Sequence, residues 1–168
     1  MQGNLANVTL EHFADDGAIP NTVLPVVIYR QAVATPSAEA LEALFDANGW
    51  PSAWRWSVYD FHHYHSTTHE CLGVAQGSAR LQLGGESGRT FEVTAGDVIV
   101  LPAGTGHKRL SASDDFLVVG AYPPGCSADL LRGEEGERPG ADERIAAVPL
   151  PKTDPVGGQG GPVREKWG

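Results

Sequence analysis

The sequence predicts an all-β fold, an antiparallel sandwich or barrel with one or two short helices. Seven short segments rich in β-branched and aromatic residues follow one another at regular spacing in residues 53–122, and turn residues separate them. The chain also contains 21 glycines and 12 prolines among its 168 residues, and helical bundles avoid both. This length predicts one domain that can bury a core of its own.

Residues 1–34 contain two apolar runs, NVTLEHF and VLPVVIYRQAV, that are typical of strands. Pro25 interrupts the second run and removes a backbone donor, so we expect that strand at a sheet edge or at a bulge. Both runs precede the region of regular strands. We therefore expect residues 1–34 to pack on the barrel or on a neighbouring copy, and the second arrangement predicts a homodimer.

Residues 35–52 contain the clearest helix signal and a connection to the barrel. In TPSAEALEALFDANGW the apolar residues recur at helical spacing. Ser37 or Thr35 can cap the first turn, and an Asn-Gly pair ends the pattern. The sequence thus predicts one short helix near residues 37–48.

Residues 53–122 are predicted to form the barrel, and residues 123–168 an extension outside it. The charged, glycine-broken stretch LLRGEEGERPGADER is typical of a solvated loop with at most one short helix. The next stretch, IAAVPLPKTDPVGG, is expected to lie extended on the barrel. The final stretch, GGQGGPVREKWG, is expected to be a flexible tail.

Charge and composition argue against some classes of binding partner and indicate a compartment. The formal net charge of −9 argues against nucleic acid and anionic membranes, because both are bound through clusters of lysine and arginine. There is no apolar run of about 18 residues, and no basic start followed by an apolar run, so we expect neither a membrane span nor a signal peptide. For Cys71 and Cys126 we expect reduced thiols in a cytoplasmic protein, with a disulfide as the open alternative.

Four of the six histidines fall in HHYHSTTHE, residues 62–70. If residues 57–65 form a strand, His63 and His65 share one face of it, and His62 takes the other. Glu70 opens the next strand, which can pair with the first and return its carboxylate to the same face. Two imidazoles and a carboxylate would suit a divalent transition metal. The alternative is a histidine-rich polar turn on the surface.

A second motif, GDVIVLPAGTGHKRL, predicts where a fourth ligand enters. The apolar strand ends at Pro102, Gly104 and Gly106 permit a tight turn, and His107 starts the return strand. A histidine placed by a rigid turn at the start of a strand is well suited to complete a metal site. A surface turn at residues 62–70 would leave this second motif unexplained.

These two motifs resemble those of the cupin family, G-x5-H-x-H-x3,4-E-x6-G followed by G-x5-P-x-G-x2-H-x3-N. The matching residues are His63, His65, Glu70 and Gly77 in the first motif and Gly96, Pro102, Gly104 and His107 in the second. The chain departs from the two motifs at two positions: Ser57 stands where the first motif has glycine, and Ser111 stands where the second has asparagine. Neither position supplies a metal ligand in the motifs. Over most of its length the chain resembles the YjlB-like subgroup of bacterial cupins.

The resemblance implies a cupin-type double-stranded β-helix, or jelly roll, that binds one divalent transition metal ion. The implied ligands are His63, His65, Glu70 and His107. Iron, manganese, nickel, copper and zinc all accept this ligand set, so the identity of the metal stays open.

Three further residues are candidates for roles beside the metal. His69 lies in the turn, where it could be an alternate ligand, a proton shuttle or neither. Arg109 follows His107 by two residues and is expected to point into the barrel, with Tyr59 lining the same cavity. There Arg109 could bind a carboxylate, or it could pair with one of the neighbouring acids, Asp114 or Asp115.

Other conspicuous residues have simpler interpretations. For His62 a surface or packing role is favoured. For Trp50, Trp54 and Trp56 we expect burial in a core or an interface rather than contact with a ligand.

The function predicted from these observations is a metal-dependent enzyme that acts on a small organic anion. Four protein ligands leave two positions of an octahedral metal for substrate and for oxygen or water, so dioxygenase-like chemistry is favoured over isomerisation. The alternative is a metal-dependent module that binds or senses a small molecule without turnover. The fold alone does not choose between them.

Overall fold

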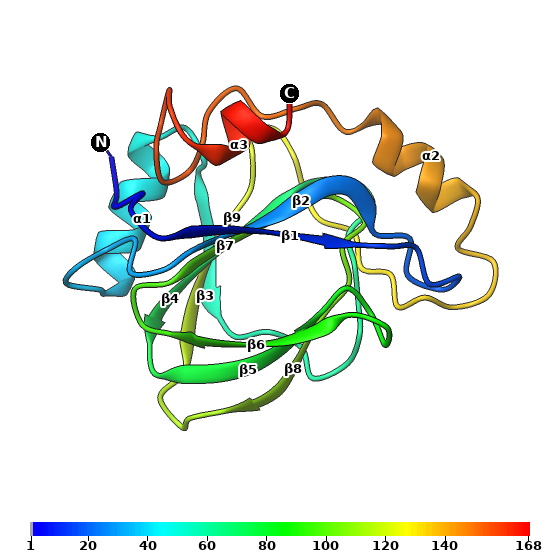
Figure 1. Cartoon of the computed structure of the whole chain (residues 1–168), viewed down its shortest axis with the longest axis horizontal. Coiled ribbons are helices and arrows are strands. Elements are labelled where there is room, and N and C mark those ends of the chain that lie inside the picture. The colour runs from blue at the N-terminus through cyan, green and yellow to red at the C-terminus, as the bar shows by residue number, and fades with distance from the viewer. Residues whose placement is uncertain (1) are drawn as a thin grey trace.

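The structure is a computed structural model that describes residues 2–168. Its strands form two antiparallel sheets that face each other, and its helices lie outside them (Figure 1). In chain order the elements are β1 (Val8–Phe13), β2 (Thr22–Tyr29), α1 (Ala38–Ala47), β3 (Ser52–Trp56), β4 (Glu70–Gln76), β5 (Ser78–Leu83), β6 (Arg89–Thr94), β7 (Val98–Leu101), β8 (His107–Ala112), β9 (Leu117–Ala121), α2 (Gly140–Ala147) and α3 (Pro162–Lys166). No helix among these residues is long and apolar enough to cross a membrane.

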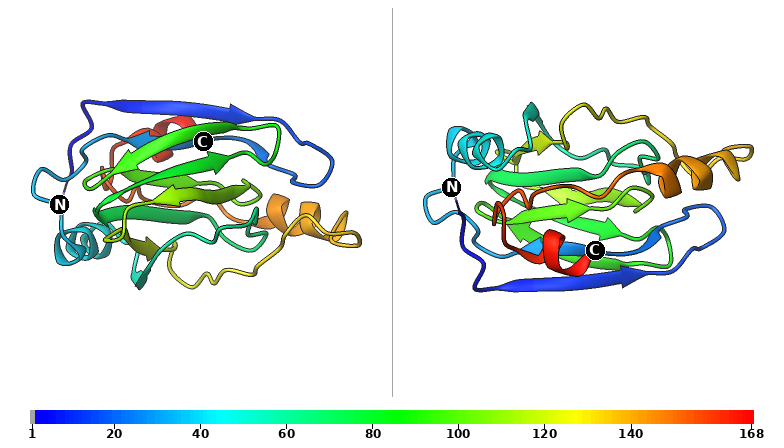
Figure 2. Two further views of the ribbon diagram at one scale, coloured as in Figure 1. Left: turned by 90° about the horizontal axis from the view of Figure 1, so that it is seen from below. Right: turned by 90° about the horizontal axis from the view of Figure 1, so that it is seen from above.

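The larger sheet has six strands in the order β1-β2-β7-β4-β9-β3, and the smaller sheet has three in the order β6-β5-β8. Neighbouring strands are antiparallel throughout both sheets. Figure 2 shows β1 along one long edge of the molecule and α2 projecting at one end. This arrangement confirms the predicted all-β, double-sheet fold.

The inner strands of the larger sheet, β2, β7, β4 and β9, are mostly buried on both faces, whereas the edge strands β1 and β3 are partly exposed. In β2, Val26 and Ile28 pack between the two sheets, whereas Val27 and Tyr29 pack in a second core on the outer face. Helix α1 and helix α3 contact that outer face. Burial on both faces explains why the strand sequences are nearly continuous apolar runs rather than alternating ones.

Helix α1 confirms the helix predicted near residues 37–48. The hydroxyl of Ser37 accepts a hydrogen bond from the backbone N–H of Ala40 at 3.0 Å, so Ser37 is the residue that caps it. Leu41 and Phe45, one turn apart, are fully buried against the sheet.

The two N-terminal strands belong to the larger sheet. Strand β2 lies between β1 and β7, so it is not an edge strand. The β1–β2 register shifts between Glu11 and Phe13, opposite the part of β2 that contains Pro25. The proline is therefore accommodated by an irregularity in the pairing, the second of the two alternatives that the sequence left open.

The strand predicted over residues 57–65 is wrong. Strand β3 ends at Trp56, and residues 57–69 run as an irregular segment that touches a neighbour only at intervals. Tyr59 accepts a hydrogen bond from the backbone N–H of Arg109, and His63 and His107 form an isolated bridge. This segment borders β8 without a continuous ladder, and β4 pairs with β7 and β9 instead of with it.

The extension after residue 122 is partly packed on the barrel, which corrects the expectation of a flexible tail. The charged stretch 130–144 stays mostly exposed and contains the start of one short helix, α2, as expected. Residues 127–131, the strap, run beside the segment of residues 62–67, and Leu131 forms a backbone bridge with Tyr64. At the C-terminus the expected flexible tail forms α3, and the indole of Trp167 is 4% exposed and donates to the backbone oxygen of Pro25 at 2.9 Å. Apolar burial and this hydrogen bond fix the chain end on the larger sheet.

Candidate metal centre

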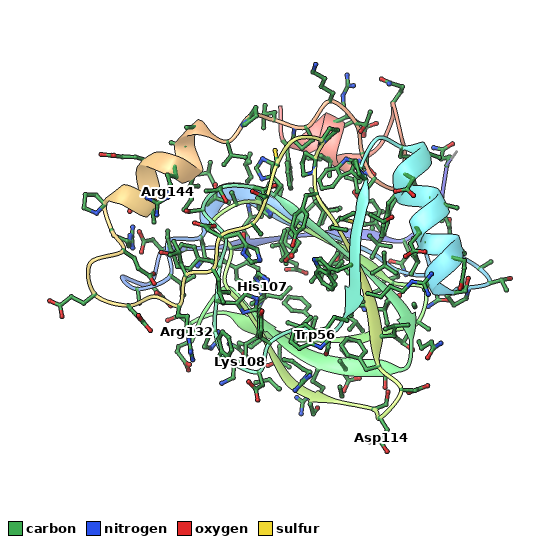
Figure 3. All side chains as sticks on the ribbon, turned by 180° about the vertical axis from the view of Figure 1, so that it is seen from behind. Trp56, His107, Lys108, Asp114, Arg132 and Arg144 are labelled. Atoms are coloured by element: carbon green, nitrogen blue, oxygen red, sulfur yellow. The ribbon has the colours of Figure 1, made fainter. Side chains whose placement is uncertain are left out.

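Three buried histidines from two parts of the chain converge between the sheets. His63 and His65 lie on the irregular segment, and His107 is the first residue of β8. One nitrogen from each ring lies within 4.8 Å of the other two. Figure 3 labels His107 in the interior of the molecule.

The turn of the second motif places His107. Gly104 has a φ of 95°, and a Cβ there would lie 2.7 Å from the backbone oxygen of Asn21. The backbone N–H of Gly104 donates to the backbone oxygen of His65 at 2.8 Å. The two motifs are thus joined by a direct hydrogen bond beside the centre.

Hydrogen bonds at Nδ1 orient all three rings. Nδ1 of His63 lies 3.0 Å from the backbone oxygen of Phe61, and Nδ1 of His107 lies 3.0 Å from that of Thr105. Nδ1 of His65 lies 2.5 Å from the backbone oxygen of Asp129. A carbonyl oxygen can only accept, so each Nδ1 carries the hydrogen, and in the neutral rings each Nε2 presents a lone pair.

Glu70, the first residue of β4, supplies a carboxylate to the same place. Its Oε1 lies 3.1 Å from Nε2 of His107 and 3.3 Å from Nε2 of His65. This oxygen is buried, and while the three rings are neutral it has no hydrogen-bond donor among the described residues. A carboxylate oxygen and imidazole lone pairs that face one another without a donor are the arrangement that a divalent cation satisfies.

The electrostatics of the centre agree with this donor set. Burial and then the neighbouring ring of His107 lower the pKa of His63 to about 2, so His63 is neutral. Burial also acts to lower the pKa of His65, but the carboxylate of Glu70 outweighs it and raises that pKa to about 9. Burial acts to raise the pKa of Glu70, whereas His65 and His107 hold it well below its usual range. A proton on His65 therefore occupies the place that a metal would take.

A cavity of about 250 Å³ opens against the histidines. Most of its wall is aromatic or aliphatic, and the polar groups gather around the three histidines and Glu70. The residues that line it are Trp54, Trp56, Ser57, Val58, Tyr59, His63, His65, Glu70, Leu72, His107, Tyr122, Ala128, Asp129 and Leu130. An apolar cavity with a few convergent polar groups is the usual form of a small-molecule site.

Two tryptophans for which burial in a core or an interface was expected line this cavity, although Trp54 also packs against the core between the sheets. The indole N–H of Trp54 donates to the hydroxyl of Tyr122 at 2.9 Å, and Trp56 is 50% exposed at the cavity. Only Trp50 is fully buried, as expected. Trp54 and Trp56 are two residues apart in one strand, so their side chains point to the same face. This spacing was the sequence signal that could have placed both of them at one site.

Tyr122 was not predicted from the sequence. Its hydroxyl donates to Oε2 of Glu70 at 3.1 Å, so Tyr122 orients the carboxylate whose other oxygen faces the histidines. Burial and Glu70 raise the pKa of Tyr122, which keeps the hydroxyl protonated and able to donate. Tyr122 and Glu70 are 52 positions apart, which no local pattern reveals.

Asp129, in the strap, was not predicted either. Its carboxylate accepts from the backbone N–H of Ser66 at 2.7 Å and from the hydroxyls of Ser66 and Thr67. The same residue gives its backbone oxygen to His65. The strap therefore both forms part of the cavity wall and orients one ring of the histidine cluster.

His69 lies away from the centre and outside the cavity wall. The backbone N–H of Ala103 donates to Nδ1 of His69 at 2.9 Å, and Nε2 of His69 lies 3.2 Å from the backbone oxygen of Pro149. Its ring contacts that of Trp167, with centroids 4.8 Å apart. Through its two ring nitrogens, His69 links Ala103 of the second motif to Pro149 of the C-terminal extension.

His62 also lies outside the histidine cluster, with its Nε2 2.9 Å from a carboxylate oxygen of Glu86.

Tyr59 and Arg109 lie near the centre in different ways. Tyr59 lines the cavity, and its ring meets that of His63 edge to face with centroids 5.1 Å apart. Arg109 is partly buried and donates from its guanidinium to the hydroxyl oxygen of Ser57 at 3.0 Å. Ser57 lines the cavity, so Arg109 stands directly behind the wall rather than in it.

The chain is similar to several known proteins. Residues 58–119 match the Cupin domain family. Over 156 residues the chain is 42% identical to "Uncharacterized protein YjlB" of Bacillus subtilis, and the match covers 92% of this chain and 93% of that protein. A 93-residue stretch is 31% identical to "Probable oxalate decarboxylase" of Arthroderma benhamiae, 53% of this chain but 23% of that protein. A solved DUF861 family protein of Thermotoga maritima has a TM-score of 0.35 and 24% identity, over 56% of this chain and 96% of its own.

Proposed function

The chain belongs to the cupin family, and from this premise we propose that it is a metal-dependent enzyme acting on a small organic anion. The observation that supports this is the convergence of three imidazole nitrogens and the unsatisfied Oε1 of Glu70 at an open cavity. His63, His65, Glu70 and His107 would hold one divalent ion. Iron, manganese, nickel, copper and zinc are all compatible with these ligands.

When bound, such an ion supplies a Lewis acid for a substrate oxygen and, for a redox-active metal, a path for electrons to oxygen. The protein supplies orientation and a dry environment. The Tyr122 hydroxyl holds Glu70, while the rings of Trp54 and Tyr59 exclude water from one side of the cavity. Oxygen-dependent chemistry remains our preferred reaction over isomerisation.

For the anion we propose a contact through Ser57 that depends on Arg109. The guanidinium donates to the Ser57 oxygen, which leaves the hydroxyl hydrogen of Ser57 free to point into the cavity. Arg109→Met should keep the fold and the metal but weaken the binding of a small carboxylate by about 1.5–3 kcal/mol, the scale of a hydrogen bond to a charged group. Arg80→Met, on the exposed face of β5, is the matched control. If Arg109→Met instead lowers the thermal stability and leaves the anion affinity unchanged, the role of Arg109 is structural.

One observation favours a second candidate, a binding or sensing module without turnover. Both carboxylates in the cavity wall have a role other than proton exchange, because Glu70 would hold the metal and accepts from Tyr122, while Asp129 accepts from Ser66 and Thr67. No carboxylate in that wall is thus free to exchange protons with a substrate.

Two measurements separate these candidates. Elemental analysis of protein made in its native host identifies the bound metal. Oxygen consumption by the iron-loaded protein is then followed with a panel of small acids and catechols. Consumption that depends on one of these compounds supports the enzyme, whereas a ligand-induced rise in melting temperature without turnover supports the binding module. Protein that contains no metal and binds none in vitro would contradict both.

A further inference from the structure

We propose that the molecule bound in this cavity is an aryl-substituted small acid: one oxygen-bearing head group for the metal, attached to a planar apolar body. This inference rests on the proposed metal site and names the class of ligand that the site takes. It is argued from the cavity rim, the charge of the wall and the size of the space.

The rim of the cavity is apolar and open to solvent. Six large hydrophobic side chains are exposed among residues 2–168, and three of them, Trp56, Tyr59 and Leu130, line this one cavity. Their exposed fractions are 50%, 38% and 45%. Apolar side chains that gather at one concave site, rather than scattering over the surface, indicate a surface that an apolar group covers.

The rim rings are arranged in contact with one another and with the metal centre. The centroids of Trp56 and Tyr59 are 4.9 Å apart, and those of Tyr59 and Phe61 are 4.8 Å apart in a stacked pair. Tyr59 also meets the edge of the His63 ring. The rings of Trp56, Tyr59 and His63 meet edge to face and so form a chain of aromatic contacts from solvent to the proposed metal site, against which a planar ligand can pack. Phe61, which is not among the residues that line the cavity, stacks on Tyr59 and supports it. Figure 3 shows Trp56 on the same side of the fold as His107.

The charge of the wall disfavours a compact dianion. Its charged acidic residues are Glu70 and Asp129, and neither lysine nor arginine is among its described lining residues. A single carboxylate would have two partners in this wall, the proposed metal and the Ser57 hydroxyl. A second carboxylate would meet aromatic rings and acidic oxygens, where it loses hydration without gaining a partner.

The size of the space agrees with one ring plus a head group. The cavity measures about 250 Å³, whereas a dry cavity of about 150 Å³ is enough to hold benzene. The difference leaves room for a carboxylate and one neighbouring oxygen at the metal.

The test compares three acids with the same 2-hydroxy acid head group: lactate carries a methyl group, mandelate a phenyl ring and malate a second carboxylate. Each is titrated by calorimetry into the full-length protein loaded with zinc, which does not turn over by redox chemistry. We expect mandelate to bind at least about tenfold more tightly than lactate, and malate no more tightly than lactate. Tightest binding of malate, equal binding of lactate and mandelate, or no binding of any of them would overturn the inference.

Two variants assign the preference to the rim. Trp56→Ala and Leu130→Ala should each reduce the ratio of mandelate to lactate affinity by about two- to tenfold. Leu110→Ala is the control, because Leu110 is exposed to the same 45% as Leu130 but lies outside the cavity wall. An unchanged ratio in both rim variants would contradict the assignment. Zinc content measured before each titration keeps the two proposals apart: protein without zinc refutes the metal site itself, whereas zinc-loaded protein without the preference refutes only the ligand class.

Discussion

The imidazole of His65 is oriented by a residue 64 positions later in the chain, since its Nδ1 lies 2.5 Å from the backbone oxygen of Asp129. The carboxylate of Asp129 in turn holds the backbone of Ser66, the neighbour of His65, at 2.7 Å. The strap and the histidine segment therefore hold each other in place. Any change that releases the strap should therefore also release the ring of His65, a proposed metal ligand.

Asp129→Ala tests this relationship. Losing the carboxylate should free the strap, so metal affinity should fall by about 10–100-fold, as for other partners that orient a ligand. Competition with a chromogenic chelator measures the affinity. Asp114→Ala is the control, because Asp114 lies in an exposed turn at the far tip of the molecule (Figure 3). Equal affinities in the two variants would show that the strap does not orient His65.

His65→Ala should lose more metal than Asp129→Ala does, because a donor atom is removed rather than reoriented. His62→Ala should retain its metal, since Nε2 of His62 faces Glu86 instead of the cluster. Elemental analysis of the two purified variants gives the comparison. Similar metal content in both would mean that the wrong histidines have been assigned as ligands.

His69 should make folding stability depend on pH. Burial lowers its pKa from 6.5 to about 4 in the folded chain, so between these values the unfolded chain binds the extra proton. Stability should therefore be lost as the pH falls from about 6.5 to about 4, by roughly 3 kcal/mol at most. Denaturant unfolding of metal-free protein at several pH values measures this. His69→Gln should have a flatter profile over that range, and parallel profiles would contradict the prediction.

Asp154 should be essential for the docked C-terminus. Its buried carboxylate accepts from the hydroxyl of Tyr29 at 2.7 Å and from the backbone N–H groups of Val156, Gly157 and Val163. Asp154→Ala leaves these donors buried without an acceptor, so unfolding free energy should fall by at least about 3 kcal/mol. Chemical denaturation beside Asp114→Ala provides the measurement. A decrease in unfolding free energy of less than about 1 kcal/mol would mean that the extension adjusts to the loss of the carboxylate, so that Asp154 is not essential.

We also predict that the protein self-associates as a homodimer. Strand β1 is an edge strand, paired only with β2 in the described chain, and the side chain of Val23 nearby in sequence is 90% exposed. An uncovered edge and an exposed apolar side chain are features that a second copy can cover. Light scattering at micromolar concentration should give twice the 17.8 kDa of one chain. A measured mass equal to that of one chain would contradict the predicted homodimer.

The parts of the site that the sequence predicted are those that local spacing encodes. The ligand positions of His63, His65 and Glu70 follow from a short motif, and the turn with Gly104 fixes His107. The helix capped by Ser37 was predicted for the same reason. Each of these features depends on residues a few positions apart, where alternation, capping and turn geometry act.

The parts that the sequence did not predict depend on distant contacts. Tyr122 acts on Glu70 and Asp129 on His65, over separations of 52 and 64 positions. The C-terminal stretch has the glycine content of a flexible segment, yet Trp167 is buried because the outer face of the larger sheet offers it an apolar surface. The strand expected at residues 57–65 does not form. A strand needs a neighbour with which its backbone pairs continuously, and β8 meets this segment only at intervals.

The distance in sequence between His65 and Asp129 also has a consequence for biosynthesis. A ribosome makes the chain in the N- to C-terminal direction, so all four proposed metal ligands exist once residue 107 has been added. The carbonyl group that orients His65 is made 22 residues later, and Trp167, whose ring contacts that of His69, is made 38 residues after that. We therefore expect a nascent chain that ends before the strap to hold its metal loosely, and loading to become tight only after synthesis has passed Asp129.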